Sequence, residues 1–390
     1  MKAQSAGHVV IAPDKFKGSL PAAAVAAHLA TGILAVTPDV GIRLAPVADG
    51  GEGTLEAALL NGFEARPVRA TDPTGQPVDA AIGIRGSTAI VELALASGLQ
   101  LCGRPLDPLN ASSFGTGELI RAALDSGCTT VILGIGGSAS TDGGAGMVQA
   151  LGGRVLDASG GQLGTGGGAL VNAHTVDLTD LDPRITRTTF IIASDVDNPL
   201  LGPGGSAAVF APQKGATPEQ VEHLEASLSC WARAVAKAVG TDFSREPGAG
   251  AAGGVGFGAM ALLGAQSRPG IALLLDMIGF ADLLIGARLV LTGEGSLDEQ
   301  SLSGKAPMGV AIAAHGQGVP VVAVAGVSSL TTSALQAAGF RATYTLNQLE
   351  PDLGRSIGNA GPLLERTGQR IAQDWLEPYE STTSDPRNAT

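Results

Sequence analysis

The stretch LGIGGSASTDGGAG, residues 133–146, concentrates residue types that can hold a phosphate group, and it follows a short apolar run. Consecutive backbone N–H groups in such a loop can form a concave anion-binding nest, and hydroxyl groups can add further donors. The candidate nucleotide-binding residues are Gly136, Gly137, Ser138 and Thr141. Asp142 could hold a magnesium-bound water or cap the next helix. Tight packing of the loop against its strand is the purely structural alternative.

The same loop also fits the GxGxxA pattern of dinucleotide-binding folds, through Gly134, Gly136 and Ala139. Asp157 would then be the acid that binds a ribose hydroxyl. In such a site the helix begins inside the glycine motif, whereas here further glycines oppose any helix before about Met147. An anion-binding loop is therefore favoured, and a dinucleotide site stays as the alternative.

Candidate cations for phosphate lie elsewhere in the chain. Lys15 and Lys17 follow the first apolar strand, where ligands of parallel sheets bind. Lys214 and Lys305 are further candidates. Lys305 follows a glycine, but Glu299 stands where a P-loop needs its first glycine, so a P-loop is excluded.

Carboxylates cluster in loops of the same kind, several of them rich in glycine. Such groups can bind Mg²⁺ through few protein ligands or remove a proton from a substrate hydroxyl. Helix capping is the alternative for the acids that precede helices. The clusters are Asp49 with Glu52, Asp195 with Asp197 and Asn198, Glu294 with Asp298 and Glu299, and Asp142 alone.

Composition excludes several classes of function. The net charge is −12 and only 3% of the residues are aromatic, which disfavours nucleic acid as a partner. No apolar run approaches the roughly 20 residues of a membrane helix. The three cysteines are scattered, so we expect a reducing cytoplasmic location, and the five histidines show no metal-binding spacing. We expect no membrane partner and a monomer or homodimer.

Both ends of the chain alternate apolar strands with helices, as in HVVIAP, then SLPAAAVAAHLATGI with Ser19 as helix cap. Continuous apolar strands alternating with helices predict a parallel sheet covered on both faces. The middle differs, because residues 64–94 read as consecutive strands joined by turns, which predicts antiparallel pairing. A long helix should begin after Thr217.

We therefore predict an α/β fold with two domains. Residues 1–62 and 288–380 should form a Rossmann-like parallel-sheet domain, and residues 63–287 an inserted mixed α/β domain. The segment 381–390 is polar and should be disordered. The glycine-rich stretch PGAGAAGGVGFGAM, residues 247–260, follows no strand and is interpreted as a flexible lining or hinge.

Seven stretches together resemble the bacterial glycerate kinase family. In order along the chain they are IAPDKFKGSL, PVADGGEGT, DPLNASSFGTGELI, LGIGGSASTDGGAGM, DVDNPLLGPGGSAAVFAPQKGA, GAGAAGGVGFG and LTGEGSLDEQSLSGKAP. The likeness runs from Ile11 to Pro307, and PVVAVAG extends it to Gly326. Each stretch alone is a modest signal, whereas the ordered set is specific.

The resemblance implies two α/β domains with an active-site cleft between them and ATP-dependent phosphorylation of D-glycerate with Mg²⁺. It gives Asp195 as the catalytic base and Lys17 as a phosphate or substrate lysine. It places Glu294, Asp298 and Lys305 in the family's TGEG…GK stretch. The expected product is 2-phospho-D-glycerate, with 3-phospho-D-glycerate as the alternative.

The remaining site residues complete one set of expectations. Asp195, Lys17 and Lys305 are expected to be catalytic. Substrate or phosphate binding is expected of Lys15, Asp49, Asn198 and Lys214, with Arg85 and Arg104 as further guesses for the substrate carboxylate. Metal binding is expected of Asp142, Glu294 and Asp298. Two other functions stay open: an NAD(P)-dependent hydroxy-acid oxidoreductase, and a non-catalytic protein that binds a small anion.

Overall fold

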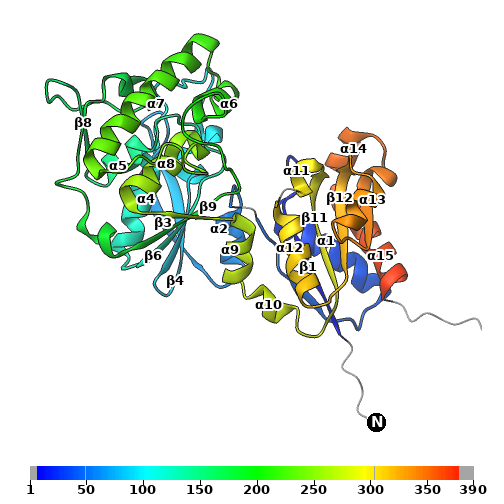
Figure 1. Ribbon diagram of the computed structural model, residues 1–390. Coiled ribbons are helices and arrows are strands. Elements are labelled where there is room, and N and C mark those ends of the chain that lie inside the picture. The colour runs from blue at the N-terminus through cyan, green and yellow to red at the C-terminus, as the bar shows by residue number, and fades with distance from the viewer. Residues whose placement is uncertain (1–6, 49, 303, 377–390) are drawn as a thin grey trace, which may run out of the picture. The chain divides into compact units, whose positions relative to one another are not determined.

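The computed structural model describes residues 7–48, 50–302 and 304–376 of the chain. It divides into two compact units (Figure 1). Unit 1 comprises residues 1–46, 282–299 and 311–390, and unit 2 comprises residues 47–281 and 300–310. Among the described residues, no helix combines the length and the apolar character needed to cross a membrane.

Unit 1 contains a five-stranded sheet in the order β13-β12-β11-β1-β2, and every pair of neighbours in it is parallel. Strands β1 and β11 are adjacent, with Pro13 opposite Gly293 at their carboxyl ends. Helices α1 and α15 approach closely, since a Cβ atom at Gly32 would lie 2.0 Å from the Glu365 carbonyl oxygen. The core of unit 1 combines these helices with the apolar residues of the central strands.

The strands of unit 1 are β1 (His8–Pro13), β2 (Ile42–Leu44), β11 (Ala287–Leu297), β12 (Val321–Ser328) and β13 (Ala342–Thr345). Its helices are α1 (Ala22–Val36), α13 (Thr332–Ala337), η5 (Leu346–Gln348), α14 (Leu353–Gly358) and α15 (Ala360–Trp375). Three helices cross the divisions between the units: α10 (Phe280–Leu283), α11 (Glu299–Leu302) and α12 (Ala306–Gly316).

Unit 2 contains a six-stranded mixed sheet in the order β10-β9-β6-β5-β4-β3. Strands β10, β9, β6 and β5 are parallel, whereas β4 and β3 run antiparallel at one edge. A separate antiparallel pair joins β7 to β8. The core of unit 2 is built around large buried side chains such as Trp231, Phe190 and Phe257.

The strands of unit 2 are β3 (Glu64–Thr71), β4 (Pro77–Arg85), β5 (Thr88–Glu92), β6 (Thr130–Gly134), β7 (Arg154–Leu156), β8 (Thr175–Asp177), β9 (Thr189–Ala193) and β10 (Gln266–Arg268). Its α-helices are α2 (Thr54–Leu59), α3 (Ala94–Ser97), α4 (Phe114–Asp125), α5 (Ala145–Ala150), α6 (Ser206–Phe210), α7 (Pro218–Val239), α8 (Ala251–Leu263) and α9 (Gly270–Met277). The 3₁₀ segments are η1 (Leu99–Leu101), η2 (Gly167–Asn172), η3 (Pro183–Arg187) and η4 (Pro212–Lys214).

The predicted α/β class is confirmed, and so is the antiparallel pairing of the stretch 64–94. Thr217 caps α7 in a capping box, because its side chain accepts the Gln220 N–H while the Gln220 side chain accepts the Thr217 N–H. The predicted cap at Ser19 is wrong. Pro21 occupies the N-cap position of α1, and the Ser19 hydroxyl donates to the Ile357 carbonyl oxygen at 2.9 Å.

The compact units group residues 47–62 and 300–310 with the middle of the chain. The boundaries expected from the sequence, near residues 62 and 287, therefore differ from this grouping by some residues, and the division into domains stays a prediction. The expected tail at 381–390 lies outside the described residues.

The glycine-rich stretch 247–260 is not a loose lining. It forms most of α8 and is buried, and three consecutive residues in it, Ala252, Gly253 and Gly254, adopt left-handed backbone angles. Ala252 has a φ of 54°, which is uncommon for a residue with a side chain. A Cβ atom at Gly253 would lie 1.9 Å from the Ser140 carbonyl oxygen, so glycine is needed for this close approach.

Candidate functional site

The carboxyl ends of the parallel strands in unit 2 gather several of the expected site residues. Strands β6 and β9 are direct neighbours, and Gly134 pairs with Ala193 at their ends. The glycine loop follows β6, and the loop that carries Asp195 and Asn198 follows β9. Ligands of open α/β sheets bind at such edges, so this edge is the candidate site of unit 2.

The segment after Val47 packs onto the same edge. A Cβ atom at Gly50 would lie 2.5 Å from the Ala193 carbonyl oxygen, and one at Gly136 would lie 2.5 Å from the Gly51 Cα atom. The backbones approach so closely that side chains are excluded there. Asp49, an expected substrate-binding residue, lies outside the described residues.

Backbone hydrogen bonds hold the glycine loop at both ends. The Leu99 N–H donates to the Gly137 carbonyl oxygen, and the Ala139 N–H donates to the Ser97 carbonyl oxygen, each at 2.9 Å. Farther along, the Gly143 N–H donates to the Gly253 carbonyl oxygen at 2.9 Å. The loop is therefore a fixed part of the core, which suits preorganised recognition of a ligand.

Asp142 is fully buried, and its carboxylate accepts hydrogen bonds from backbone N–H groups. One carboxylate oxygen, Oδ2, accepts the Ser113 N–H and the Ser113 hydroxyl at 2.8 Å each, and the Gly146 N–H at 3.3 Å. The other oxygen, Oδ1, accepts the Gly144 N–H at 3.2 Å. Both oxygens accept hydrogen bonds, from Ser113 just before α4 and from Gly144 and Gly146 at the start of α5, so this geometry favours the capping interpretation of Asp142 over metal binding.

Lys214 is only 2% exposed, at the end of the short η4 segment. Its ammonium group donates to the Ser138 hydroxyl at 2.8 Å and to the Ser140 carbonyl oxygen at 2.5 Å. Burial lowers the pKa of Lys214 to about 7, and the negative charge of Asp142 partly opposes that effect. The lysine therefore bonds to the glycine loop itself.

The hydroxyl groups of the loop differ in their surroundings. Ser138 retains 8% of its surface exposed, whereas Ser140 and Thr141 are fully buried. Within the described part of the chain, the hydroxyl oxygens of Ser140 and Thr141 have no hydrogen-bond partner. Of these three residues, Ser138 keeps the most exposed surface.

Asp195 is exposed at the end of β9, and its Oδ1 accepts the Gly270 N–H, the first of helix α9, at 3.2 Å. This bond orients the carboxylate while leaving the residue accessible to solvent. The neighbouring Asn198 donates its side-chain N–H to the Gly204 carbonyl oxygen at 2.8 Å, which shapes the loop between β9 and α6. A carboxylate so placed can accept a proton from a bound hydroxyl.

Unit 1 gathers the other expected residues at the carboxyl ends of β1 and β11. Lys15 and Lys17 follow β1, Glu294 lies in the last part of β11, and Asp298 follows directly after it. The segment after β1 packs against the last part of β11, because a Cβ atom at Gly295 would lie 3.1 Å from the Lys17 backbone nitrogen. The segments that carry the two lysines and the two carboxylates are therefore neighbours in unit 1.

Lys305 belongs to unit 2 and directly precedes α12. Its carbonyl oxygen accepts the Met308 and Gly309 N–H groups at 3.0 and 3.1 Å, and its side chain is half-buried. Arg85, a guess for the substrate carboxylate, has other partners. It donates to the carbonyl oxygens of Asn61 and Met277 and lies over the Phe63 ring.

The dinucleotide alternative is wrong for a topological reason. Asp157 lies in the turn after β7, and β7 pairs with β8 outside the sheet that contains the glycine loop. Hydrogen bonds from the Ser159 side chain and from the Gly161 backbone lower the pKa of Asp157, so its carboxylate closes a local turn. The acid therefore has the wrong position to bind a ribose.

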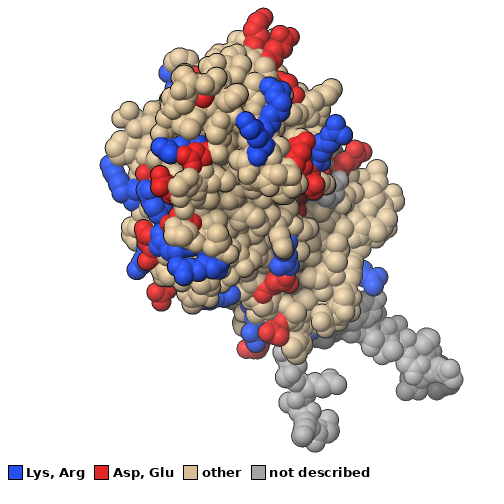
Figure 2. All heavy atoms as spheres, turned by 60° about the vertical axis from the view of Figure 1, so that its left-hand side comes forward, with Lys and Arg blue, Asp and Glu red and all other residues tan. Residues whose placement is uncertain are grey.

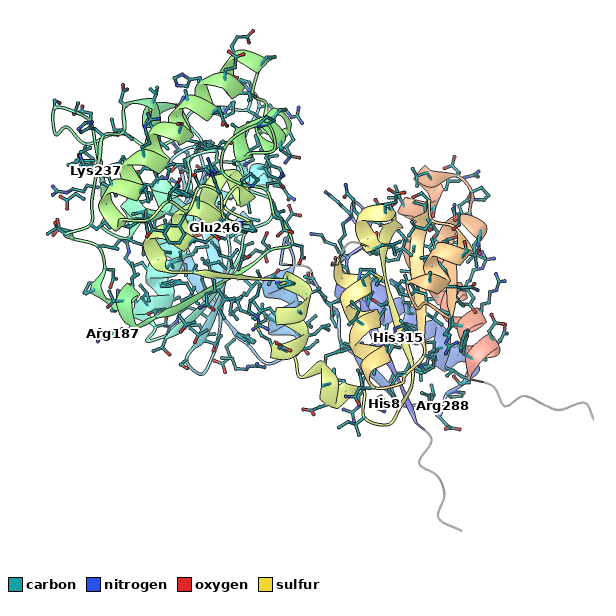
Figure 3. The ribbon with its side chains drawn as sticks, in the orientation of Figure 1. His8, Arg187, Lys237, Glu246, Arg288 and His315 are labelled. Atoms are coloured by element: carbon teal, nitrogen blue, oxygen red, sulfur yellow. The ribbon has the colours of Figure 1, made fainter. Side chains whose placement is uncertain are left out.

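The histidines whose bonds are described have structural partners. His8 and His315, both labelled in Figure 3, lie in unit 1 and bond to the carbonyl oxygens of Leu283 and Gly339. His28 bonds to Glu365 at 2.8 Å. Among the described residues, no group of three or more His, Cys, Asp or Glu could hold a metal ion.

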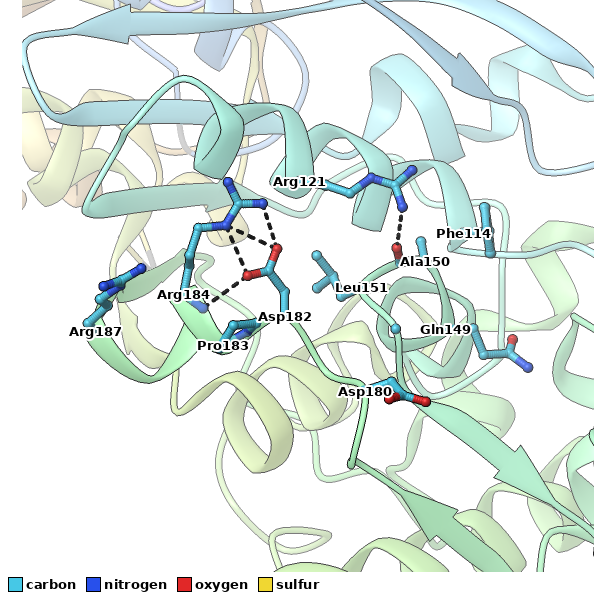
Figure 4. Close-up of a pocket in the computed structure, with 11 residues that line it drawn as sticks. Phe114, Arg121, Gln149, Ala150, Leu151, Asp180, Asp182, Pro183, Arg184 and Arg187 are labelled. Carbon is cyan, nitrogen blue, oxygen red and sulfur yellow. Dashed lines mark hydrogen bonds and ion pairs between the residues drawn. The ribbon is translucent and has the colours of Figure 1, made fainter.

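A surface pocket of about 640 Å³ lies beside α4 and η3 in unit 2 and contains three arginines (Figure 4). Arg184 donates to Asp182 and Asp125, and Arg121 donates to the Ala150 carbonyl oxygen. The charge of Arg184 in this pocket is therefore paired with carboxylates of the protein. Figure 2 shows basic and acidic side chains interspersed over the face it presents.

Three supporting residues carry no role in the sequence-based expectations. Glu92 is buried at the end of β5 and accepts the Gly53 and Leu55 N–H groups, which fixes the start of α2. Ser113 bonds to Asp142, and the Trp231 indole N–H donates to the Gly143 carbonyl oxygen at 3.0 Å. A glutamate that ends an apolar strand was the one local signal that could have revealed Glu92.

Comparison with known proteins gives a consistent result. A family model described as "Glycerate kinase family" matches residues 9–376. The chain is 44% identical over 371 residues to a glycerate kinase from Bacillus subtilis, covering 93% of this chain and 96% of that protein. It is 44% identical to glycerate 2-kinase from Escherichia coli, covering 93% of this chain and 97% of that protein.

A solved structure assigned as a glycerate kinase 2 from Salmonella typhimurium LT2 matches with a TM-score of 0.83 and 42% identity. The match covers 95% of this chain and 98% of the other. The fold and these relatives define an α/β phosphotransferase that acts on an alcohol group. More narrowly, the chain belongs to the glycerate kinase family.

Proposed function

We propose that this protein transfers a phosphoryl group from ATP to D-glycerate with the assistance of Mg²⁺ and releases 2-phospho-D-glycerate. The observation that carries the proposal is the exposed Asp195, oriented by the Gly270 N–H at the sheet edge that also holds the glycine loop. Family membership supports the kinase activity and the small-molecule substrate. The scattered unpaired cysteines suit a cytoplasmic enzyme.

In this proposal Asp195 accepts the proton of the glycerate hydroxyl as the oxygen attacks the phosphoryl group. The N–H groups of Gly136 and Gly137 and the Ser138 hydroxyl bind the nucleotide phosphates. Lys17, with Lys15 beside it, neutralises negative charge on the transferred group. Lys305 is assigned the same kind of charge stabilisation.

The carboxylates of unit 1 fit a magnesium ion of the kind that kinases use. Mg²⁺ prefers oxygen ligands and commonly takes one or two carboxylates, with substrate phosphates and water completing its shell. Glu294 lies in the last part of β11 and Asp298 directly follows the strand, so each offers one carboxylate, without a protein-only cage among the described residues. Bound there, the ion would neutralise charge on the phosphate oxygens.

The deciding experiment measures ADP release after D-glycerate is added to the protein with Mg-ATP. We expect release that depends on D-glycerate, and its absence would refute the proposed activity. Enolase then identifies the product, because the 2-phosphate is a direct enolase substrate and the 3-phosphate is not. Product that enolase accepts only after a mutase is added would mean 3-phosphoglycerate.

Asp195→Asn tests the proposed base. We expect kcat to fall by roughly 10²- to 10⁴-fold while ADP affinity changes little, because general-base catalysis contributes on that scale. Asp157→Asn is the matched control, since Asp157 lies in the turn after β7, outside the six-stranded sheet. Near wild-type turnover of Asp195→Asn would show that the base has been misassigned.

Lys17→Ala tests the proposed phosphate role. Turnover and ATP affinity should both fall, because a cation that faces a phosphate contributes to ground-state and transition-state binding alike. Lys237→Ala is the control, since Lys237 is an exposed lysine near the end of α7 (Figure 3). Unaltered steady-state kinetics of Lys17→Ala would contradict this role.

A further inference from the structure

Lys214 is a buried lysine that bonds to the glycine loop. Because its side chain is buried, it has little access to a ligand. The side chain is 2% exposed, and its ammonium nitrogen bonds to two oxygens of the loop, Ser138 Oγ and the Ser140 carbonyl oxygen. Asp142 is fully buried in the loop after β6, and its negative charge attracts the Lys214 ammonium group. This geometry therefore does not favour direct contact between Lys214 and substrate.

The hydrogen bond from Lys214 determines whether the Ser138 hydroxyl donates or accepts at this contact. A lysine ammonium group has three donors and no acceptor, whereas a serine hydroxyl has one donor and can accept twice. When Lys214 is protonated, its ammonium group must donate at the 2.8 Å contact with Ser138, and Ser138 Oγ must accept. The hydroxyl hydrogen of Ser138 is thereby left to point toward another acceptor.

The backbone around Ser138 is held from a second side. Gly98 and Ser138 form an antiparallel bridge, and the neighbouring Gly137 and Ala139 bond to Leu99 and Ser97. The oxygen of Ser138 is therefore fixed by the backbone and by Lys214 together. Ser138 keeps 8% of its surface exposed and Lys214 keeps 2%, so Ser138 is the more accessible of the two.

We propose that Lys214 is a positioning residue that acts through Ser138, holding the Ser138 hydroxyl as a hydrogen-bond donor to a phosphate oxygen of the bound nucleotide. This inference rests on the proposed function, which places the nucleotide phosphates at the glycine loop. It changes the role expected of Lys214 from ligand binding to orientation of a ligand-binding hydroxyl. The hydrogen bond from the charged Lys214 to Ser138 is charge-assisted, and such bonds are short and strong. It therefore favours a single orientation of the Ser138 hydroxyl.

The test measures the affinity of the full-length protein for ADP by calorimetry at about pH 6, where the lysine is mainly protonated. The variants are Ser138→Ala, Lys214→Met and the double variant, with Lys237→Met as the control for loss of a lysine. Each single change at the site should weaken ADP binding on the order of ten- to hundred-fold, as expected for one hydrogen bond to a charged group. The control should bind ADP as the wild type does.

The double variant decides between an indirect and a direct role. If Lys214 acts through Ser138, the two changes are coupled, and the double variant should bind ADP about as weakly as the weaker single variant. Effects that multiply would mean that Lys214 contacts the nucleotide independently and would overturn the proposal. Unchanged ADP affinity in folded Ser138→Ala or folded Lys214→Met would also overturn it.

Two further variants keep the test decisive if Lys214→Met does not fold. Ser138→Thr retains the hydroxyl and should bind ADP within about three-fold of the wild type, whereas Ser138→Ala should not. Lys214→Gln retains a shorter neutral donor and should give an intermediate loss. Equal ADP affinity in Ser138→Thr and Ser138→Ala would overturn the proposal.

The binding assay also separates this proposal from the proposed function. A wild type that binds ADP but releases none with D-glycerate and Mg-ATP would refute the glycerate kinase activity alone. The ADP affinities of the variants would then still decide the role of Lys214. A wild type that binds no ADP would overturn the positioning role.

Discussion

Lys214→Met should change how the stability of unit 2 depends on pH. Burial lowers the pKa of Lys214 from 10.5 to about 7 in the folded protein. In the interval between these values the unfolded chain binds a proton that the folded chain does not. Stability therefore rises with pH across that interval, and below about pH 7 the group adds no pH dependence.

The expected size follows from the two pKa values. Each pH unit inside the interval corresponds to about 1.4 kcal/mol for one proton. Between about pH 7 and 9 the wild type should therefore gain roughly 2–3 kcal/mol relative to Lys214→Met, which cannot titrate at this position. All other titrating groups are common to both proteins, so the difference between them isolates Lys214.

Urea unfolding at several pH values between about 6 and 9 measures this difference. Trp231 is fully buried in unit 2, and Trp375 lies in α15 of unit 1. Both proteins should carry Trp375→Phe, so that tryptophan fluorescence reports on unit 2 alone. A difference in unfolding free energy that stays constant from pH 6 to 9 would refute the buried, titrating lysine.

Three further changes should have local effects of different sizes. Gly253→Ala should lower the melting temperature strongly or prevent folding, because its Cβ atom would lie 1.9 Å from the Ser140 carbonyl oxygen; wild-type circular dichroism melting would contradict that contact. Thr217→Ala should cost about 1 kcal/mol in urea unfolding through loss of the capping box, and no measurable cost would contradict the cap. Asp142→Asn should destabilise by on the order of 1–3 kcal/mol, because an amide group can place donors against the Ser113 N–H. The Mg²⁺ concentration for half-maximal activity should stay unchanged in Asp142→Asn, and a large increase would restore the metal-ligand interpretation.

Local patterns predicted much of the fold correctly. Thr217 and Gln220 are three residues apart, so the capping box at α7 can be read from neighbouring letters. The turns that follow β3 and β4 predicted the antiparallel pairing correctly, because each turn joins two strands that are adjacent in the sequence. The prediction at Ser19 failed because Pro21 already supplies the extended N-cap conformation, and Ser19 bonds to Ile357, far along the chain.

The site residues divide in a similar way. The sequence indicated that Asp195 and the glycine loop follow strands, and adjacent parallel strands place both at one edge. It left Asp142 with two interpretations, because its partner Ser113 lies 29 residues away. It could not reveal that residues 252–254 turn left-handed, since their contacts with Ser140 and Gly143 exist only in the folded chain.

The sequence by itself determined the chemistry available to this protein: a glycine loop rich in donors, carboxylates and lysines after strands, and an ordered set of motifs that identifies the family. These depend on residue types and on spacings of a few residues. Only the tertiary structure decided which groups face a ligand and which support the loop. Lys214 reaches the Ser140 carbonyl oxygen across 74 residues of sequence. Folding removes water from around Lys214, and the lysine then supports the glycine loop as a buried side chain. Local sequence does not show this burial, because it depends on residues far apart in the chain.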